Sequence, residues 1–183
     1  MLEQYLVEHC SPTLAGLKTA NLFSVRFIDE EELNQHIKQC EKKFLNKGIS
    51  LILLKKRAGT ALIYVCRREK LQKDLQKNGV KEFLKKYGYE NTDEEEAIAC
   101  LKARLNLEEK FPHEIGLFLG YPLGDVIGFI ENAGKNSKCA GCWKVYCNEC
   151  ETMKLFEKFK KCTRIYTKLW RQGTSVEKLT VAA

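Results

Sequence analysis

Two Cys-x-x-Cys pairs lie close together in the last third of the chain, and they restrict the local fold more than any other feature. The pairs are Cys139/Cys142 and Cys147/Cys150, with four residues between them. Four thiolates can bind tetrahedral zinc or an iron–sulfur cluster. The sequence therefore predicts a metal site formed by Cys139, Cys142, Cys147 and Cys150, with zinc or an iron–sulfur cluster as its cofactor.

The short spacer between the pairs sets a geometric condition on this metal site. Zinc ribbons separate their pairs by about 15–20 residues, whereas here the spacer is only Trp143 to Tyr146. These four residues include no turn former and suit a β-strand. In an extended spacer the pairs would lie about 15 Å apart, at about 3.3 Å per residue. One ion can bind all four thiols only where the spacer bends sharply.

Thiol redox chemistry is the second interpretation of the same segment. Asn148 is placed to cap a helix, with Glu151 three residues later, so Cys147 and Cys150 would flank a helix N-terminus. The positive end of the helix dipole, with lysines nearby, would favour the thiolate form. A thioredoxin-like context would also need a preceding βαβ unit, which the sequence does not show. This interpretation predicts a thiol-dependent redox enzyme or an electron-transfer partner.

Unligated thiols are the third interpretation, because a free cysteine packs as a small apolar residue. It is the interpretation we favour for the five cysteines outside the cluster: Cys10, Cys40, Cys66, Cys100 and Cys162. Cys40 and Cys162 fall on apolar helical stripes, which supports burial. For the cluster itself all three interpretations stay open.

The chain lacks the features of a secreted or membrane protein, so we expect it in the cytoplasm. Its first residues have neither a basic segment nor an apolar one. No apolar run reaches the roughly 18–20 residues that span a bilayer. In a reducing cytosol, the nine cysteines are expected to be thiols, metal ligands or redox-active groups and not structural disulfides.

The hydrophobic pattern predicts a single α+β domain over residues 1–183, with a small, mainly antiparallel sheet packed by several helices. The clearest strands are Ile49–Leu54 and Ala61–Cys66, with a turn glycine between them, so we expect a β-hairpin over about 49–66. Another strand is expected at 21–28. Helices are expected at 2–9, ending near Pro12, and at 29–47, 67–77, 80–87 and 92–105, together with one long C-terminal helix at 149–171.

Several single residues carry structural predictions. Thr92 is expected to cap the helix that follows it, with Glu95 completing a capping box. Pro122 is placed to begin a helix, as is Pro112. Two glycines on the helix after Pro122, at 124 and 128, would let another backbone approach closely.

The net charge of +7 lies in the C-terminal part of the chain. Residues 133–183 hold 11 Lys or Arg and 4 Asp or Glu, whereas residues 1–132 hold 20 of each. The loop before this region makes 133–183 a candidate basic, cysteine-rich subregion. The long helix within it carries an apolar stripe of Leu155, Phe159, Cys162, Tyr166 and Leu169, with basic residues on the opposite side. A solvated helix face is the simplest interpretation; the functional one is a binding surface for an acidic protein, favoured here over nucleic acid.

His113 beside Glu114 is the other candidate site, because a histidine and a carboxylate at a helix start can form an acid/base or ligand pair. A structural histidine is the interpretation we favour. The chain contains no P-loop, no nucleophile-elbow motif and no kinase signature, so it names neither a substrate nor a reaction.

Four segments resemble one family: Pro12–Phe23, Phe111–Pro122, Gly141–Tyr146 and Lys160–Thr163. The family comprises uncharacterised proteins from anaerobic bacteria, known only as a domain of unknown function, and the resemblance covers nearly the whole chain. It implies a cytosolic, single-domain protein without an assigned activity. A loose link of the family to flavodoxin and iron-uptake genes makes a flavodoxin-like protein the acidic partner that we expect.

The resemblance also ranks the cysteines. It implies that Cys142 and Cys162 are the central ones, and it brings Cys162 and His113 forward as partners of Cys142. Family members often have no cysteine at the positions of Cys147 and Cys150. A shared four-cysteine site is therefore not what the resemblance implies.

Overall fold

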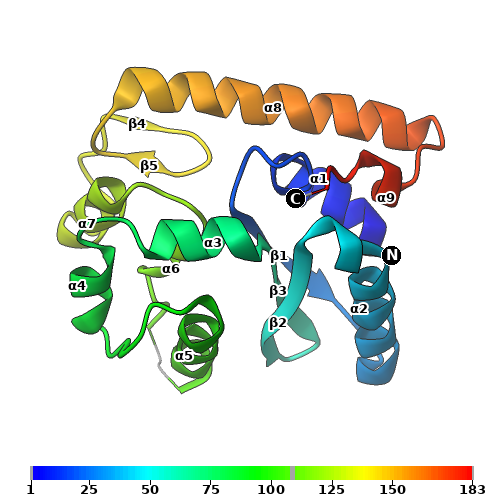
Figure 1. The fold of residues 1–183 in the computed structure, drawn as a ribbon, viewed down its shortest axis with the longest axis horizontal. Helices are drawn as coiled ribbons and strands as arrows, with labels where there is room; N and C mark the ends of the chain where they lie inside the picture. The colour runs from blue at the N-terminus through cyan, green and yellow to red at the C-terminus, as the bar shows by residue number, and fades with distance from the viewer. Residues whose placement is uncertain (1, 108–109, 183) are drawn as a thin grey trace. The chain divides into compact units, whose positions relative to one another are not determined.

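A computed structural model describes residues 2–107 and 110–182, with all their side chains except that of Leu45. The fold is α+β, 55% helix and 16% strand, as predicted (Figure 1). Contacts divide it into two compact units, which we call unit 1 (residues 2–71 and 161–182) and unit 2 (residues 72–160). This division groups 161–182 with the N-terminal part. The expectation of one domain with a subregion at 133–183 stays a prediction.

Unit 1 is built on a three-stranded antiparallel sheet of β1 (Ala20–Arg26), β2 (Ile49–Arg57) and β3 (Thr60–Arg67), in the order β1-β3-β2. Strands β2 and β3 form the predicted hairpin, which is longer than expected. Ala58 and Gly59 connect them with φ angles of 44° and 71°. A two-residue turn with positive φ at both residues has a backbone twist that matches the twist of the two strands it joins.

Helices α1 (Leu2–Leu14), α2 (Glu30–Phe44) and α9 (Val176–Leu179) complete unit 1, with a 3-10 turn at Leu45–Lys47. The Asp29 carboxylate accepts from the backbone N–H groups of Glu31 and Glu32, so it caps α2. The apolar stripe of α2 on which Cys40 was predicted to lie is buried along its whole length: Leu33, Ile37, Cys40 and Phe44. Ser175 caps α9 through its hydroxyl, which accepts from the Lys178 N–H.

The predicted end of α1 near Pro12 is wrong. The helix passes through Pro12 to Leu14, and Cys10 and Leu14 are fully buried in the core of unit 1. Proline removes one backbone donor from a helix, but burial of the last turn outweighs that loss here. Pro12 still accepts at its carbonyl from Leu17 N–H and so helps to close the turn that ends the helix.

Unit 2 is mainly helical. Its elements are α4 (Val80–Lys85), α5 (Glu94–Leu107), α6 (Ile115–Phe118), α7 (Leu123–Glu131), β4 (Cys139–Ala140) and β5 (Lys144–Val145), while α3 (Arg68–Leu75) and α8 (Glu149–Arg171) each contain a boundary between the units. The cap predicted for α5 is wrong. Asp93, not Thr92, precedes the helix and accepts from the Glu95 N–H, because Thr92 is turned inward and buried.

The long helix α8 has the predicted bounds, Glu149–Arg171. Phe159 and Cys162 on its predicted stripe are buried, and Leu155 and Tyr166 are half-buried. Leu169 was predicted to face inward but is 36% exposed. A heptad-like stripe drifts around a straight helix by about 20° per seven residues, and Trp170 packs against the core instead. Among the described residues, no helix combines the length and apolar character that a bilayer span requires.

Candidate functional site

A buried aspartate at the start of α7 organises the cysteine-rich hairpin of unit 2. Asp125 is only 2% exposed. One of its carboxylate oxygens accepts from the backbone N–H of Tyr146 at 2.8 Å and of Cys147 at 2.9 Å. The other accepts from the indole N–H of Trp143 at 2.8 Å. Charge-assisted bonds of this kind are among the stronger hydrogen bonds in proteins, so one side chain fixes three residues of the hairpin.

Two glycines of α7 make this approach possible. A Cβ added at Gly124 would lie 2.4 Å from the Cys147 sulfur, and one at Gly128 would lie 2.5 Å from Tyr146 Cγ. The sequence predicted a close approach at both positions. The group that approaches is a side chain in each case.

The chain reverses direction over three residues that include only the first residue of the Trp143–Tyr146 spacer. Cys139 pairs with Val145 and Ala140 with Lys144, so Gly141, Cys142 and Trp143 form the turn of a small antiparallel hairpin. The strand predicted within the spacer is present as β5. A Cβ at Gly141 would lie 2.3 Å from the Phe156 ring, so the turn packs tightly against the first part of α8.

The four cysteines of the predicted metal site have different surroundings. Cys139 is half-buried and packs against Val145, Phe156 and Phe159, whereas Cys142, Cys147 and Cys150 are exposed. Across residues 2–107 and 110–182, no three His, Cys, Asp or Glu side chains gather in a group that could hold an ion. The metal site stays a prediction, and it would require the hairpin to rearrange.

The prediction that the helix N-terminus favours the thiolate of Cys147 is wrong in direction. Burial of the sulfur raises the pKa of Cys147, and the charge and hydrogen bond of Asp125 raise it further, against a smaller lowering by Lys138. The residue is exposed overall, but its sulfur lies against Gly124. Burial also raises the pKa of Cys139, helped by the charges of Glu149 and Asp125. At both thiols burial is the largest cause of the raised pKa, and nearby carboxylates add to it.

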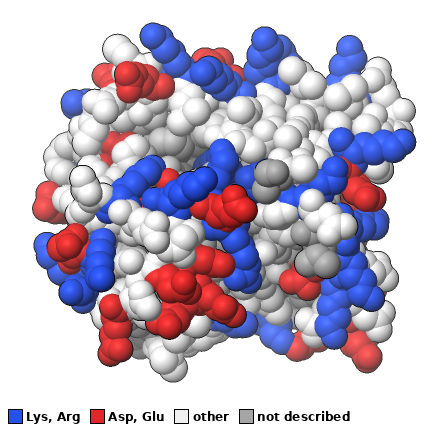
Figure 2. All heavy atoms as spheres, in the orientation of Figure 1, with Lys and Arg blue, Asp and Glu red and all other residues white. Residues whose placement is uncertain are grey.

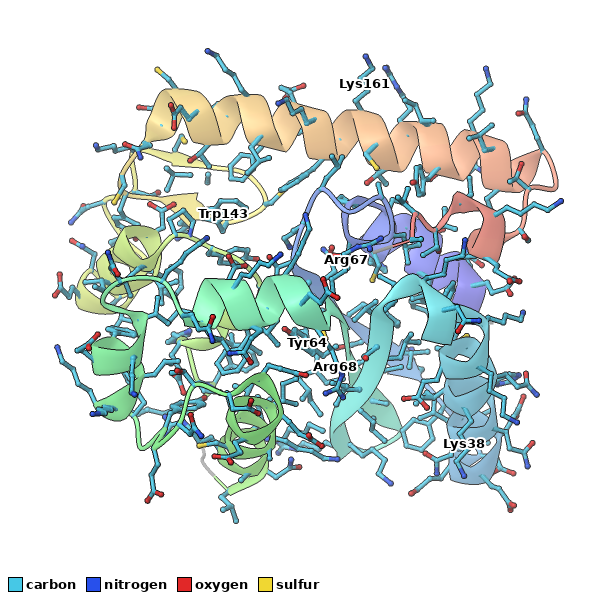
Figure 3. All side chains as sticks on the ribbon, in the orientation of Figure 1. Lys38, Tyr64, Arg67, Arg68, Trp143 and Lys161 are labelled. Atoms are coloured by element: carbon cyan, nitrogen blue, oxygen red, sulfur yellow. The ribbon has the colours of Figure 1, made fainter. Side chains whose placement is uncertain are left out.

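A cavity of about 380 Å³ lies beside the turn of the hairpin. Four of its lining residues are aromatic: Phe111, Tyr121, Phe129 and Trp143. The rings of Tyr121 and Trp143 stack at 4.4 Å, and the His113 ring lies 5.0 Å from that of Phe129. Figure 3 shows Trp143 on the hairpin side of this region. Aliphatic side chains complete the wall: Ile115, Leu119 and Val126.

Polar groups enter the cavity from few positions. Cys142 and Lys144 line it together with Asp125, whose oxygens are already engaged with the hairpin. The Tyr121 hydroxyl donates a long bond of 3.4 Å to the Cys142 carbonyl. Burial raises the pKa of Tyr121 to about 12, with a contribution from the Cys142 thiol, so this phenol keeps its proton at neutral pH.

Cys142 is the exposed thiol of this site. Its charged form interacts with the Lys160 ammonium, which raises the pKa of Lys160 in addition to the larger effect of Glu157. A cation beside a thiol favours the thiolate. Cys142 is therefore the cluster cysteine that combines exposure, a neighbouring cation and a place in the cavity wall.

His113 and Glu114 do not act as one pair. Glu114 is 1% exposed and accepts from Arg104 Nε at 2.6 Å and from the Tyr89 hydroxyl at 3.2 Å. His113 lines the cavity instead. The resemblance named His113 and Cys142 together, and both line this one cavity. Cys162, the third residue it named, is buried in unit 1, where burial raises its pKa to about 11.

The sequence did not predict that Asp125 would organise the hairpin, and it did not predict that Tyr121 and Phe129 would line the cavity. One signal was available for Asp125: it is the single charged residue in the apolar stretch from Ile115 to Ile130. A carboxylate there needs hydrogen-bond donors when it is buried. No comparable signal marks the two aromatic residues, because aromatic side chains are ordinary core components.

Comparison with protein families places residues 6–180 in a family described as protein of unknown function (DUF3793). The chain belongs to this family. A domain of unknown function is also what the resemblance of its motifs implied. Neither the curated proteins nor the solved structures contain a match to the chain.

Proposed function

We propose that this DUF3793 protein binds a small, largely apolar molecule in the cavity of unit 2, and that Cys142 is the reactive thiol of that site. One observation carries the proposal: an exposed thiol shares the wall of a cavity of about 380 Å³ with four aromatic rings. Ligand sites are typically concave, mostly apolar and between about 300 and 1,000 Å³. The proposal belongs to the thiol-dependent class of functions that the sequence left open.

The surroundings of Cys142 support a role in chemistry. The Lys160 ammonium, which is paired with Glu157, also interacts with Cys142, and the Tyr121 hydroxyl lies close to the same residue. In the cytosol, which the sequence predicts as the location, a thiol stays reduced. The exposed Cys150 offers a natural comparison, because it does not line the cavity.

Alkylation with two matched reagents tests the proposal. Iodoacetamide and N-benzyl iodoacetamide both alkylate a thiolate to a thioether with loss of iodide, but only the second carries an aromatic ring that the cavity can bind. We expect the benzyl reagent to modify Cys142 at least about tenfold faster, relative to iodoacetamide, than it modifies Cys150. Peptide mass spectrometry at timed intervals measures both sites in the same protein.

A variant that fills the cavity separates binding from simple reactivity. Ala140 is exposed and lines the cavity from β4, so Ala140→Phe is expected to remove the benzyl preference while iodoacetamide still reacts. Equal relative rates at Cys142 and Cys150 in the unmodified protein would end the proposal. Retention of the preference in Ala140→Phe would place the reagent outside the cavity.

Binding of zinc or an iron–sulfur cluster by Cys139, Cys142, Cys147 and Cys150 stays a separate prediction. Its test is elemental analysis and absorption spectroscopy of protein purified without oxygen. At least about one equivalent of zinc or iron, lost in a Cys147→Ser variant, would support it. Less than a tenth of an equivalent would discard it.

An acidic protein partner for the basic helix, flavodoxin-like or other, also stays a prediction. The charge on α8 supports it: from Lys158 to Arg171 the helix carries six Lys or Arg residues and no Asp or Glu. Figure 2 shows Lys and Arg side chains along the surface of α8. Binding through this surface would weaken steeply as the salt concentration rises. An affinity that does not change with salt would argue against an acidic partner.

A further inference from the structure

Two surface patches of unit 1 leave apolar side chains exposed between charges of opposite sign. The first, which we call the basic patch, lies on the last three turns of α8. Ile165 and Leu169 are 43% and 36% exposed there, one helical turn apart. Exposed cations surround them: Lys161, Arg164, Lys168 and Arg171. Figure 3 shows Lys161 pointing outward from the helix.

The second patch, which we call the acidic patch, lies where β1 leads into α2. A cavity of about 410 Å³ opens there, with apolar walls from Leu2, Phe27, Ile28 and Leu33. The Ile28 side chain is fully exposed. Asp29 and Glu32 also line this cavity, and Glu31 is exposed beside them. Arg26 and His36 line it too, so the acidic excess is modest.

We propose that the basic patch of one copy of this chain docks on the acidic patch of a second copy. Ile165 and Leu169 would enter the cavity beside Ile28, and the cations around them would face Asp29, Glu31 and Glu32. Each patch alone leaves branched aliphatic side chains in water, which is unfavourable in proportion to the apolar area exposed. Contact between the patches removes that surface and pairs the charges.

The two patches are different surfaces, so the contact is head-to-tail and not two-fold. Figure 1 shows the start of α2 and the end of α8 at separate places in unit 1. Head-to-tail contacts close into rings or continue as chains of molecules. The net charge of +7 opposes association, so we expect a weak contact, on the order of tens of micromolar. Added salt screens both the attraction of the patches and the general repulsion.

Two variants, each with one patch disabled, test the proposal by sedimentation velocity. Ile28→Lys puts a cation in the acidic patch, and Ile165→Glu puts an anion in the basic patch. Both side chains are exposed, so we expect both variants to fold normally, which circular dichroism can verify. We expect the unmodified protein to associate with increasing concentration and each variant alone to stay monomeric. An equimolar mixture should form a 1:1 complex, because each variant retains the patch that the other lacks.

Three outcomes would contradict a head-to-tail contact between the two patches. The proposal is overturned if the unmodified protein stays monomeric up to about 0.5 mM, a concentration well above the dissociation constant expected for such a contact. Association of Ile28→Lys by itself also overturns it, because the contact would then not use the acidic patch. So does a mixture that contains monomers only.

Discussion

Each unit of this protein contains a buried charged side chain that bonds three groups from other segments, and these two charges have opposite signs and different effects. In unit 1, Arg67 is 4% exposed and donates to the carbonyls of Thr13, Leu14 and Val181, each at 2.7 Å. In unit 2, Asp125 accepts from two backbone N–H groups and one indole N–H. Figure 3 labels Arg67 within unit 1.

The two charges differ in the groups that they bind. Arg67 donates hydrogen bonds to carbonyls at the C-terminal end of α1, where the helix dipole favours a cation. It also donates to the Val181 carbonyl and so connects that residue to the core of unit 1. The cysteines of unit 1 are all buried: Cys10, Cys40, Cys66 and Cys162. Asp125 instead holds a hairpin against α7 and leaves a cavity and exposed thiols beside it. The cysteines of unit 1 therefore lie in its core, whereas unit 2 presents exposed thiols, one of them in a cavity wall.

Replacing the cation of unit 1 should have the largest effect. Arg67→Met keeps most of the side-chain volume but removes the charge-assisted bonds to three carbonyls, of which those of Thr13 and Leu14 each keep one backbone donor. Because a hydrogen bond to a charged group contributes about 1.5–3 kcal/mol, we expect a loss of about 3–5 kcal/mol in the free energy of unfolding. Urea titration followed by tryptophan fluorescence measures it, since each unit contains one tryptophan: Trp170 in unit 1 and Trp143 in unit 2.

The neighbouring arginine is the matched control. Arg68 is half-buried, and the bond from its Nε goes to the Ser50 hydroxyl at 2.9 Å. Arg68→Met should therefore cost no more than about 1 kcal/mol. If both variants lose the same stability in the Trp170 signal, Arg67 is not the centre of unit 1.

Replacing the anion of unit 2 should have the next largest effect. Asp125→Asn keeps the shape but leaves one acceptor oxygen where three donors converge, and its amide N–H groups oppose one of them. We expect a loss of about 2–3 kcal/mol. Trp143 donates directly to this carboxylate, so its fluorescence should change before any unfolding occurs.

Another aspartate of unit 2 separates loss of charge from loss of the three bonds. Asp93 is exposed and caps α5 by accepting from the Glu95 N–H. Asparagine caps a helix about as well, so Asp93→Asn should change stability by a few tenths of a kcal/mol. A loss as large as that of Asp125→Asn would mean that general charge effects dominate unit 2.

The sequence predicts local structure better than it predicts the site. The α2 stripe, the 49–66 hairpin and α8 follow from periodicity and turn residues within short windows, and the structure confirms them. The Asp125 bonds join residues 18 to 22 positions apart, and periodicity does not register contacts at that separation. The prediction for Cys147 was wrong for the same reason: burial of its sulfur is the largest cause of its raised pKa, and Asp125, 22 positions earlier in the chain, raises it further.

A double variant tests how closely α7 and the hairpin approach. Gly124→Ala places a methyl carbon 2.4 Å from the Cys147 sulfur, closer than the two atoms can pack, so we expect a loss of about 1–2 kcal/mol from overpacking. In a Cys147→Ala background the sulfur is gone, and the same change should cost less than about 0.5 kcal/mol. The coupling between the two sites is read from urea unfolding of the four proteins. Additive effects would show that the two residues do not touch.

The pH dependence of Cys147 alkylation is the smallest and most specific effect. Asp125 raises the pKa of this thiol and Lys138 lowers it, so replacing each should move the rate profile in opposite directions. Asp125→Asn should shift the profile to lower pH, because the thiolate no longer faces a negative charge. Lys138→Met should shift it to higher pH. Cys150 in the same samples provides the internal reference for intrinsic reagent reactivity.

Opposite shifts distinguish electrostatics from loosening of the hairpin. Lys138 also donates to the Cys147 carbonyl at 3.1 Å, so a hairpin that merely opens in both variants would expose the sulfur and move both profiles to lower pH. The direction in which Lys138→Met shifts the pH profile therefore distinguishes the two explanations. A shift to higher pH means that the charges of unit 2 set the reactivity of this thiol directly. A shift to lower pH means that they act only by holding the hairpin closed.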